Sequence, residues 1–133
     1  MSGVADDARA VSAFTPRRVP KPWGNELIWA LTERYCAKII TIETGHRLSL
    51  QYHERKDEWI HVLAGRLRLE LEDESGELVS RELGPGDGAH IPVPRRHRYA
   101  ALERVELIEV SSPEIDDVVR LEDDYGREGT SAP

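Results

Sequence analysis

Short apolar runs alternate with polar turns along most of the chain. In one run the leucines at 67, 69 and 71 alternate with charged residues, which is the pattern of a strand with one buried face. Such runs predict strands over residues 26–30, 35–43, 48–53, 58–64, 67–71, 78–83, 89–92, 97–102 and 105–111. Residues 115–124 fit either a short helix or a final strand. Many short strands separated by Gly and Pro predict an all-β antiparallel sandwich or barrel rather than an α/β fold.

The ends of the chain predict tails around one domain. Residues 1–15 are small, polar and Ala-rich, and we expect a mobile tail or an arm that docks on a neighbour. Three prolines within residues 16–22 forbid a helix, so we expect an extended arm in which Trp23 covers an apolar face. The 133 residues suffice for one sizeable core. We therefore expect a single domain over residues 16–127 and a short tail over residues 128–133.

Charge and composition narrow the range of partners. The formal net charge is -7, with 25 acidic against 18 basic residues, so the overall field repels nucleic acid and anionic membranes. An anionic substrate would therefore need a local basic patch. Cys36 is the one cysteine, which excludes a disulfide within the chain and predicts a buried thiol. There is no apolar run of about 20 residues and no secretory signal, so we expect a cytoplasmic protein.

The stretch over residues 45–65 carries the main candidate chemistry. Gln51 and His53 are two residues apart on one strand, so their side chains share a face. Residues 54–57 form a polar turn, and Glu58 starts an apolar run that we expect to return beside the first strand. Such a hairpin would gather an amide oxygen, an imidazole and a carboxylate, which make most of a divalent metal site.

A second stretch completes this site and carries a resemblance. The spacing of Gly86, Pro92 and His97, together with that of the first stretch, resembles the two motifs of the cupin superfamily. Gln51 stands in place of the first histidine of motif one, and Pro94 in place of a glycine of motif two. The resemblance implies a cupin jelly-roll β-barrel, also called a double-stranded β-helix, in a single domain. It also implies four metal ligands, which are Gln51, His53, Glu58 and His97.

Further segments narrow the resemblance to one family. These segments are residues 21–24, 48–53, 91–92, 97–98, 108–110 and 116–127. They look like the cupin module of type II mannose-6-phosphate isomerase / mannose-1-phosphate guanylyltransferase, which usually follows a nucleotidyltransferase domain. Two positions depart from that pattern, since Lys56 stands at the family's arginine and the family's tryptophan is displaced to Trp59. A lysine loses the bidentate geometry of arginine, so the fold is a firmer expectation than the isomerase chemistry.

Strand parity suggests which residues bind the substrate. Arg47 and Ser49 are separated from Gln51 by even numbers of residues, so on one strand all three side chains would lie on the same face. We therefore expect Arg47 and Ser49 to point into the same cavity as Gln51. Arg47 is the first candidate for binding a phosphate group, and Arg96 and Arg98 are further candidates.

Lys56 and Tyr99 are the candidate catalytic residues. Lys56 occupies the family's basic position and could also contact phosphate. Tyr99 shares parity with His97 and could donate or shuttle a proton. The identity of the general base stays open. Lys38 and Glu43 are both candidates on a strand that we expect to border the cavity, and the alternation of side chains along this strand does not decide between them.

Three functions fit these residues. The first is a metal-dependent aldose–ketose isomerase of the mannose-6-phosphate type in carbohydrate metabolism, which uses one divalent ion (Zn, Fe, Mn, Co or Ni) as a Lewis acid. The second is a non-haem Fe(II) oxygenase, because two histidines and a carboxylate also suit that metal. The third is a non-catalytic sugar-binding or regulatory cupin. The expected partners are a small sugar phosphate and a second copy of the chain in a homodimer, with neither nucleic acid nor membrane.

Overall fold

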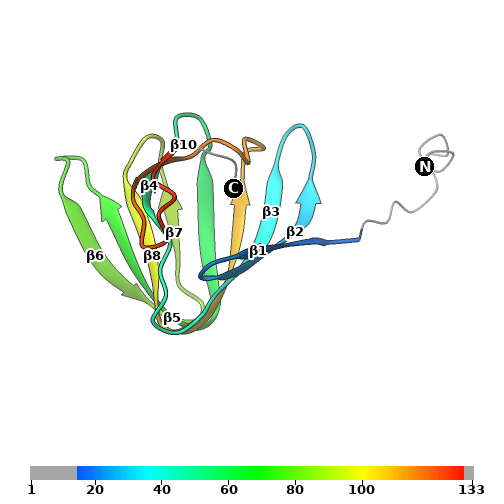
Figure 1. The fold of residues 1–133 in the computed structure, drawn as a ribbon, viewed down its shortest axis with the longest axis horizontal. Helices are drawn as coiled ribbons and strands as arrows, with labels where there is room; N and C mark the ends of the chain where they lie inside the picture. The colour runs from blue at the N-terminus through cyan, green and yellow to red at the C-terminus, as the bar shows by residue number, and fades with distance from the viewer. Residues whose placement is uncertain (1–14, 131–133) are drawn as a thin grey trace, which may run out of the picture.

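The structure is a computed structural model that describes residues 15–130 of the chain. These residues contain ten strands (Figure 1) and no helix that could span a membrane. The strands are β1 (Arg17–Lys21), β2 (Gly24–Leu31), β3 (Cys36–Ile42), β4 (Leu50–Tyr52), β5 (Glu58–Glu72), β6 (Leu78–Leu83), β7 (Gly88–Ile91), β8 (His97–Ser111), β9 (Val119–Glu122) and β10 (Gly129–Thr130). All of the predicted tail over residues 1–15 except its last residue lies outside the described part.

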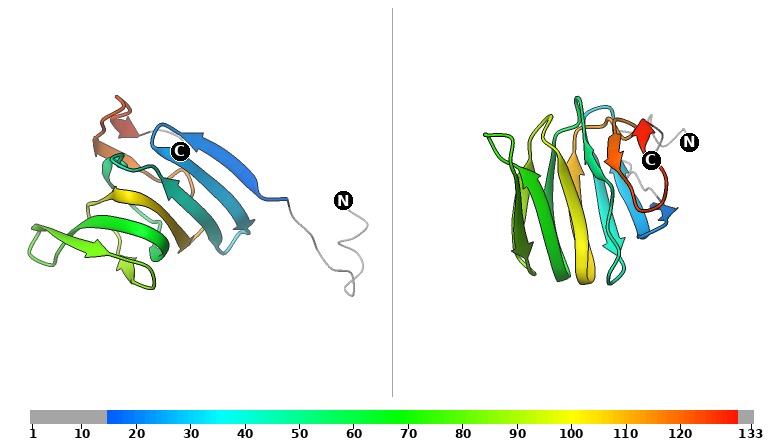
Figure 2. Two further views of the ribbon diagram at one scale, coloured as in Figure 1. Left: turned by 90° about the horizontal axis from the view of Figure 1, so that it is seen from below. Right: turned by 60° about the vertical axis from the view of Figure 1, so that its left-hand side comes forward.

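Strands β5 and β8 form one long antiparallel ribbon that organises the fold. Glu58 pairs with Ser111 at one end of the ribbon, and Leu71 pairs with His97 at the other. The pairing register shifts three times around Gly65, and shifts of this kind bend and twist a ribbon. The two ends of the ribbon therefore belong to two halves of a curled sheet that face each other (Figure 2).

A side chain would not fit at the bend. Gly65 has a φ of +85°, and a Cβ atom there would lie 1.9 Å from the carbonyl oxygen of Arg104. Only glycine adopts this conformation freely and allows so close an approach of two backbones. The sharp bend of the ribbon thus depends on a single glycine.

The apolar core lies between the two halves of the sheet. One half contains β1, β2, β3 and β7 with the first part of β5 and the last part of β8. The other half contains β4, β6, β9 and β10 with the remaining parts of β5 and β8. The core side chains are Trp23, Ile40, Ile42, Leu48, Ile60, Val62, Leu67, Leu69, Leu83, Ile91, Tyr99, Ala101, Val105 and Leu107.

The all-β antiparallel prediction is confirmed, and several details are refined. Two pairs of predicted strands join across the bend, so residues 58–72 and 97–111 are single strands. The helical alternative for residues 115–124 is wrong, because β9 lies there. Trp23 is buried as expected at 2% exposure. The tail predicted over residues 128–133 includes β10, which pairs with β9.

The predicted hairpin between residues 48–53 and 58–64 is wrong. Among the described strands β4 pairs with β8 and β9, whereas β5 pairs with β6, β7 and β8. The polar turn over residues 54–57 therefore carries the chain from one half of the sheet to the other. Side chains of β4 and β5 approach each other across the interior instead of along a shared edge.

Candidate metal centre

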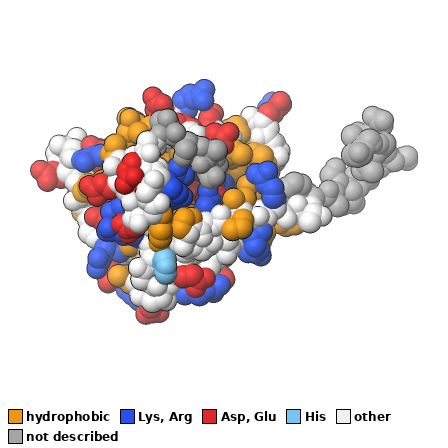
Figure 3. Space-filling model, viewed as in Figure 1, with side chains coloured by type: hydrophobic (Ala, Val, Ile, Leu, Met, Phe, Trp, Pro, Cys, Tyr) orange, Lys and Arg blue, Asp and Glu red, His pale blue; other side chains and the backbone are white. Residues whose placement is uncertain are grey.

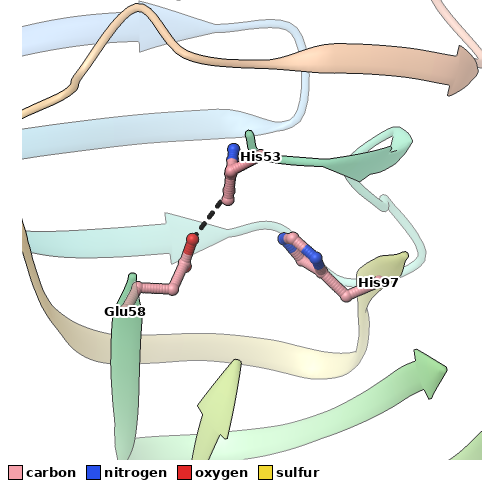
Figure 4. Close-up of side chains that lie close together, drawn as sticks. All are labelled: His53, Glu58 and His97. Atoms are coloured by element: carbon pink, nitrogen blue, oxygen red, sulfur yellow. Dashed lines mark ion pairs between the residues drawn. The ribbon is translucent and has the colours of Figure 1, made fainter. Parts of the chain in front are cut away.

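His53, Glu58 and His97 come together in the interior of the curled sheet. Each is buried, and one ligand atom from each lies within 4.8 Å of the others. His53 follows β4, Glu58 begins β5 and His97 begins β8, and Figure 4 shows the three side chains pointing toward one another. Along a straight ribbon Glu58 and His97 would be roughly 40 Å apart. The bend at Gly65 is therefore what assembles the cluster.

The outer nitrogens of both imidazoles contact backbone carbonyls. His53 Nδ1 lies 2.5 Å from the carbonyl oxygen of Asp117, and His97 Nδ1 lies 3.0 Å from that of Arg95. A carbonyl oxygen only accepts hydrogen bonds, so each Nδ1 carries the proton. The Nε2 atoms consequently present lone pairs to the interior, which is the tautomer that binds metals.

The three inward-facing atoms lack hydrogen-bond partners within the described part of the chain. These buried atoms are His53 Nε2, Glu58 Oε1 and His97 Nε2. His53 Nε2 lies only 2.7 Å from Glu58 Oε1 (dashed line in Figure 4) without hydrogen-bond geometry. Unpartnered buried acceptors are costly, and a bound cation would satisfy all three at once. The donor set of two imidazoles and one carboxylate fits Zn, Fe, Mn, Co or Ni.

Electrostatics keep Glu58 and His97 in the forms that bind a metal ion. Burial opposes ionisation of Glu58, but the positive charge of Lys56 and the close approach of His53 outweigh it, so the pKa of Glu58 is well below its usual value. Burial lowers the pKa of His97 to about 4, against the opposing effect of Glu58. Near neutral pH the site therefore presents a carboxylate and at least one neutral imidazole.

The fourth predicted ligand, Gln51, lines a small cavity whose walls also include His53. It pairs with His97 across β4 and β8, which places it beside the cluster. Its Oε1 accepts a hydrogen bond from the hydroxyl of Ser49 over 2.6 Å, and a second lone pair stays available on that oxygen. Ser49 is completely buried, so it orients Gln51. Direct contact of Ser49 with a substrate stays a prediction.

Lys56 and Tyr99 both contact the cluster. The Lys56 ammonium lies 2.9 Å from Glu109 and 3.8 Å from Glu58. Burial alone would lower the pKa of Lys56, but these two carboxylates outweigh it and raise the pKa. The Tyr99 hydroxyl donates a hydrogen bond to Glu58 Oε2 over 2.8 Å. Burial and the charge of Glu58 also raise the pKa of Tyr99.

The structure places the three predicted arginines away from the cavity. Arg47 was expected to point inward, but its exposed guanidinium pairs with Asp124 at 2.7 Å. The expected alternation of side chains between the two faces does not extend to Arg47, because this residue precedes β4. In addition, the pairing of β4 has a register shift between its first two residues. Arg96 donates to the carbonyl of Gly76 and pairs with a surface carboxylate. Arg98 is buried and donates to the carbonyls of Leu48 and Glu122.

Buried charges beside the cluster include two acids that the sequence analysis did not select. Glu109 pairs with Lys56, and Glu26 pairs with Lys38 at 3.0 Å. Burial and the nearby Glu58 raise the pKa of Glu109, against the effect of Lys56. Glu109 shares parity with the core residues Val105 and Leu107, so a charged residue at an inward position was a signal that could have revealed it. Glu43 lies on the surface, where it pairs with Arg104.

A small cavity opens beside the cluster. Its volume is about 50 Å³, and its walls include Gln51, His53 and Lys56 together with further basic side chains. A recess of about 320 Å³ adjoins it near β1, and one of about 650 Å³ adjoins it across residues 113–118. The three spaces share Ile115 in their walls, so they lie next to one another.

Comparisons with known proteins agree with this architecture. The family model described as "Mannose-6-phosphate isomerase C-terminal" matches residues 8–123. Mannose-1-phosphate guanylyltransferase ManC of Salmonella typhimurium is 38% identical over 117 residues, covering 84% of this chain and 23% of the relative. Alginate biosynthesis protein AlgA of Pseudomonas aeruginosa is 36% identical over 115 residues, covering 82% and 23%. The chain thus spans less than a quarter of the length of these relatives.

Solved structures confirm the cupin jelly-roll fold. KdgF from Halomonas sp. superposes with a TM-score of 0.64 at 29% identity, covering 76% of this chain and 89% of that one. Oxalate decarboxylase from Bacillus subtilis superposes with a TM-score of 0.72 at 20% identity, covering 80% of this chain and 30% of that one. The second likeness concerns the fold alone.

Proposed function

Because the chain belongs to the mannose-6-phosphate isomerase C-terminal family, we propose that it is a metal-dependent aldose–ketose isomerase of a sugar phosphate. One observation carries this proposal. Three buried ligand atoms that have no hydrogen-bond partner within residues 15–130 converge beside a cavity whose walls hold several basic side chains. A sugar phosphate needs both features, since its carbonyl must be polarised and its phosphate must be neutralised.

The chain supplies the ligands for one divalent ion. His53 Nε2, Glu58 Oε1 and His97 Nε2 would hold it, with Gln51 Oε1 as the fourth ligand. Glu58 contributes one negative charge, so a bound dication would keep a net positive charge and act as a Lewis acid toward the substrate carbonyl.

Lys56 and Tyr99 act on the site through Glu58. The raised pKa of Tyr99 keeps its hydroxyl protonated, and this hydroxyl already donates to Glu58. The raised pKa of Lys56 keeps its ammonium charged between two carboxylates. We therefore assign both as positioning residues that fix the orientation and charge of a metal ligand.

Glu26 is our candidate for the general base. It and Asp117 are the carboxylates that line the cavity within the described residues. Asp117 already accepts three backbone hydrogen bonds, from the N–H groups of residues 54–56. Glu26 accepts a hydrogen bond from the Lys38 ammonium over 3.0 Å through Oε1. A carboxylate with lone pairs left toward the cavity suits proton transfer between adjacent carbons.

The test is an isomerase assay with mannose 6-phosphate as substrate and detection of its ketose isomer. Protein reconstituted in turn with each divalent ion should convert it, and Glu26→Gln should lower kcat by about 100-fold or more. His61→Ala serves as the control, because His61 lies on the exposed outer side of β5. No turnover with any ion would contradict the isomerase assignment.

The same ligand set supports a second candidate. Two histidines and one carboxylate facing one point are the donor set of non-haem Fe(II) oxygenases. Oxygen consumption by the Fe(II)-loaded protein, in the absence of isomerase turnover, would favour that function. Sugar-phosphate binding without either activity would leave a binding or regulatory cupin.

Exposed apolar side chains support the expected homodimer. Trp59 and Val110 pair across β5 and β8 and are 54% and 47% exposed, and Leu63 on the same outer side of β5 is 43% exposed. Such a patch on one sheet face is typical of a contact surface. Trp59→Asp should convert a dimer to a monomer in light scattering, and an unchanged mass for both proteins would contradict this interface.

A further inference from the structure

All three lysines of the chain line one cavity. They are Lys21, Lys38 and Lys56, and the other 15 basic residues of the sequence are arginines. Lys38 pairs with Glu26 at 3.0 Å, and Lys56 pairs with Glu109 at 2.9 Å. Within residues 15–130 Lys21 has no ion-pair partner. This cavity therefore holds one ammonium group that lies within ion-pair distance of no carboxylate in residues 15–130.

Two arginines join Lys21 on the wall of this cavity. Arg120 lies on β9 and is 6% exposed, and Arg127 lies in the loop that follows it. Asp123 holds Arg127 in place, since its carboxylate accepts hydrogen bonds from the guanidinium over 2.9 and 3.0 Å. The Arg127 guanidinium is thus fixed by the fold before any ligand binds.

The cations are close enough to affect one another. Burial lowers the pKa of Lys21, and Lys38, Arg120 and Arg127 lower it further against the effect of Glu26. Burial and the neighbouring Arg127 also lower the pKa of Arg120. Like charges gathered in a partly buried recess repel one another, and an anion would relieve this repulsion. Figure 3 shows Lys and Arg side chains in a recess near the centre of one face of the molecule.

One strand, β4, separates Arg120 of this basic cluster from His97 of the candidate metal centre. Arg120 on β9 pairs in register with Gln51 on β4, and Gln51 pairs with His97 on β8. Cross-strand neighbours have Cβ atoms about 5 Å apart. A small molecule could therefore contact the cations with one end and face the three metal ligands with the other.

We propose that Lys21, Arg120 and Arg127 form a binding site for a phosphate monoester at the mouth of the cavity. The site resolves the conflict between a chain of net charge -7 and an anionic ligand, because it concentrates positive charge locally. The placement of the sugar carbonyl toward His53, Glu58 and His97 rests on the proposed function. The binding of phosphate itself does not.

Inorganic phosphate is the first probe. Its dissociation constant is measured by ³¹P NMR titration of the protein as purified, at fixed ionic strength. Lys21→Gln should weaken binding by about tenfold to a hundredfold, as expected for loss of a charged hydrogen bond. Arg66→Gln makes the same change in net charge at an exposed position paired with Glu82, and should change binding by less than about twofold. Absence of binding to wild type, or equal effects of both substitutions, would overturn the proposal.

A second measurement needs no variant and therefore does not depend on Lys21→Gln folding. Lys38 and Lys56 are buried and ion-paired, so an amine-acylating reagent should label Lys21 first among the lysines. Phosphate should slow labelling of Lys21, detected by peptide mass spectrometry, and chloride at equal ionic strength should not. Equal labelling in the two salts would overturn the proposal.

The two proposals fail in different ways. Phosphate protection of Lys21 without isomerase turnover would support the anion site and contradict the isomerase assignment. Turnover without phosphate binding or protection would contradict the anion site alone.

Discussion

The hydroxyl of Tyr99 donates a hydrogen bond to Glu58 Oε2 over 2.8 Å, while Oε1 of the same carboxylate faces His53 at 2.7 Å. One oxygen of Glu58 is thus held by the protein and the other is left for a ligand. Tyr99 is only 2% exposed, so packing also fixes its ring. This arrangement orients the only anionic member of the candidate metal centre.

Replacement of Tyr99 by phenylalanine should weaken metal binding and leave the fold intact. The hydrogen bond to Glu58 Oε2 would be lost, and loss of such an outer partner typically lowers metal affinity by about 10- to 100-fold. The free energy of unfolding should fall by about 1 to 2 kcal/mol. Competition with a chromogenic chelator measures the affinity. An affinity equal to that of wild type would show that Tyr99 does not orient the ligand.

Gly65→Ala should disturb both stability and the metal centre. The new Cβ would collide with the carbonyl oxygen of Arg104, so the bend that brings Glu58 toward His97 would open. We expect a loss of about 3 kcal/mol or more in urea unfolding together with weaker metal binding.

Gly86→Ala is the matched control for that substitution. Gly86 also has a positive φ, of +93°, but nothing lies within 4 Å of an added Cβ. It should cost only about 1 to 2 kcal/mol, the penalty of the backbone conformation. Similar losses for the two variants would contradict the role assigned to the close backbone approach at Gly65.

Lys56→Met should be strongly destabilising because it leaves two buried carboxylates without their cation. Lys56 is the shared partner of Glu109 and Glu58, and breaking a buried pair in this way costs about 3 to 5 kcal/mol. The double variant Lys56→Met/Glu109→Leu should recover part of the loss in urea denaturation. A double variant less stable than Lys56→Met alone would contradict this account.

Stability should fall in acid partly because of Asp123. Burial opposes its ionisation, but the hydrogen bonds from Arg127 outweigh this and lower its pKa below the usual 3.8. As the pH falls below 3.8, the carboxyl of Asp123 binds a proton more readily in the unfolded chain than in the folded chain. The stabilisation by ionised Asp123 is therefore present above pH 3.8 and is lost as the pH falls further. Wild type and Asp123→Asn should therefore differ by about 1 to 3 kcal/mol at pH 7 and converge in strong acid. A constant difference from pH 7 to pH 2 would contradict the assignment.

Most strands, and the three residues of the candidate metal centre that the structure brings together, could be predicted from patterns along the sequence. The alternation of Leu67, Leu69 and Leu71 marks one buried face, and each of these leucines is at least partly buried. The spacing of two motifs selected His53, Glu58 and His97, which the structure brings together. The alternation of the leucines can be read from a single sequence, whereas the set of candidate ligands followed from the resemblance to the cupin motifs.

The strand pairing and the basic cluster could not be predicted in this way. The turn over residues 54–57 has the composition of a hairpin turn, yet the chain crosses between sheet halves there because β8 is the partner of both β4 and β5. Lys21 and Arg127 come from opposite ends of the described chain and meet only through the fold. The prediction that Arg47 points into the cavity was also wrong, because side chains alternate between the two faces only within an unbroken strand.

Elemental analysis of protein purified without added metal, and again after dialysis against each divalent ion, tests the metal centre most directly. Wild type and the exposed-site control His61→Ala should each retain about one ion per chain, and His53→Ala should retain almost none. Stoichiometric metal that persists in His53→Ala, or no metal in wild type after every ion, would contradict the assignment of His53, Glu58 and His97 as a metal centre.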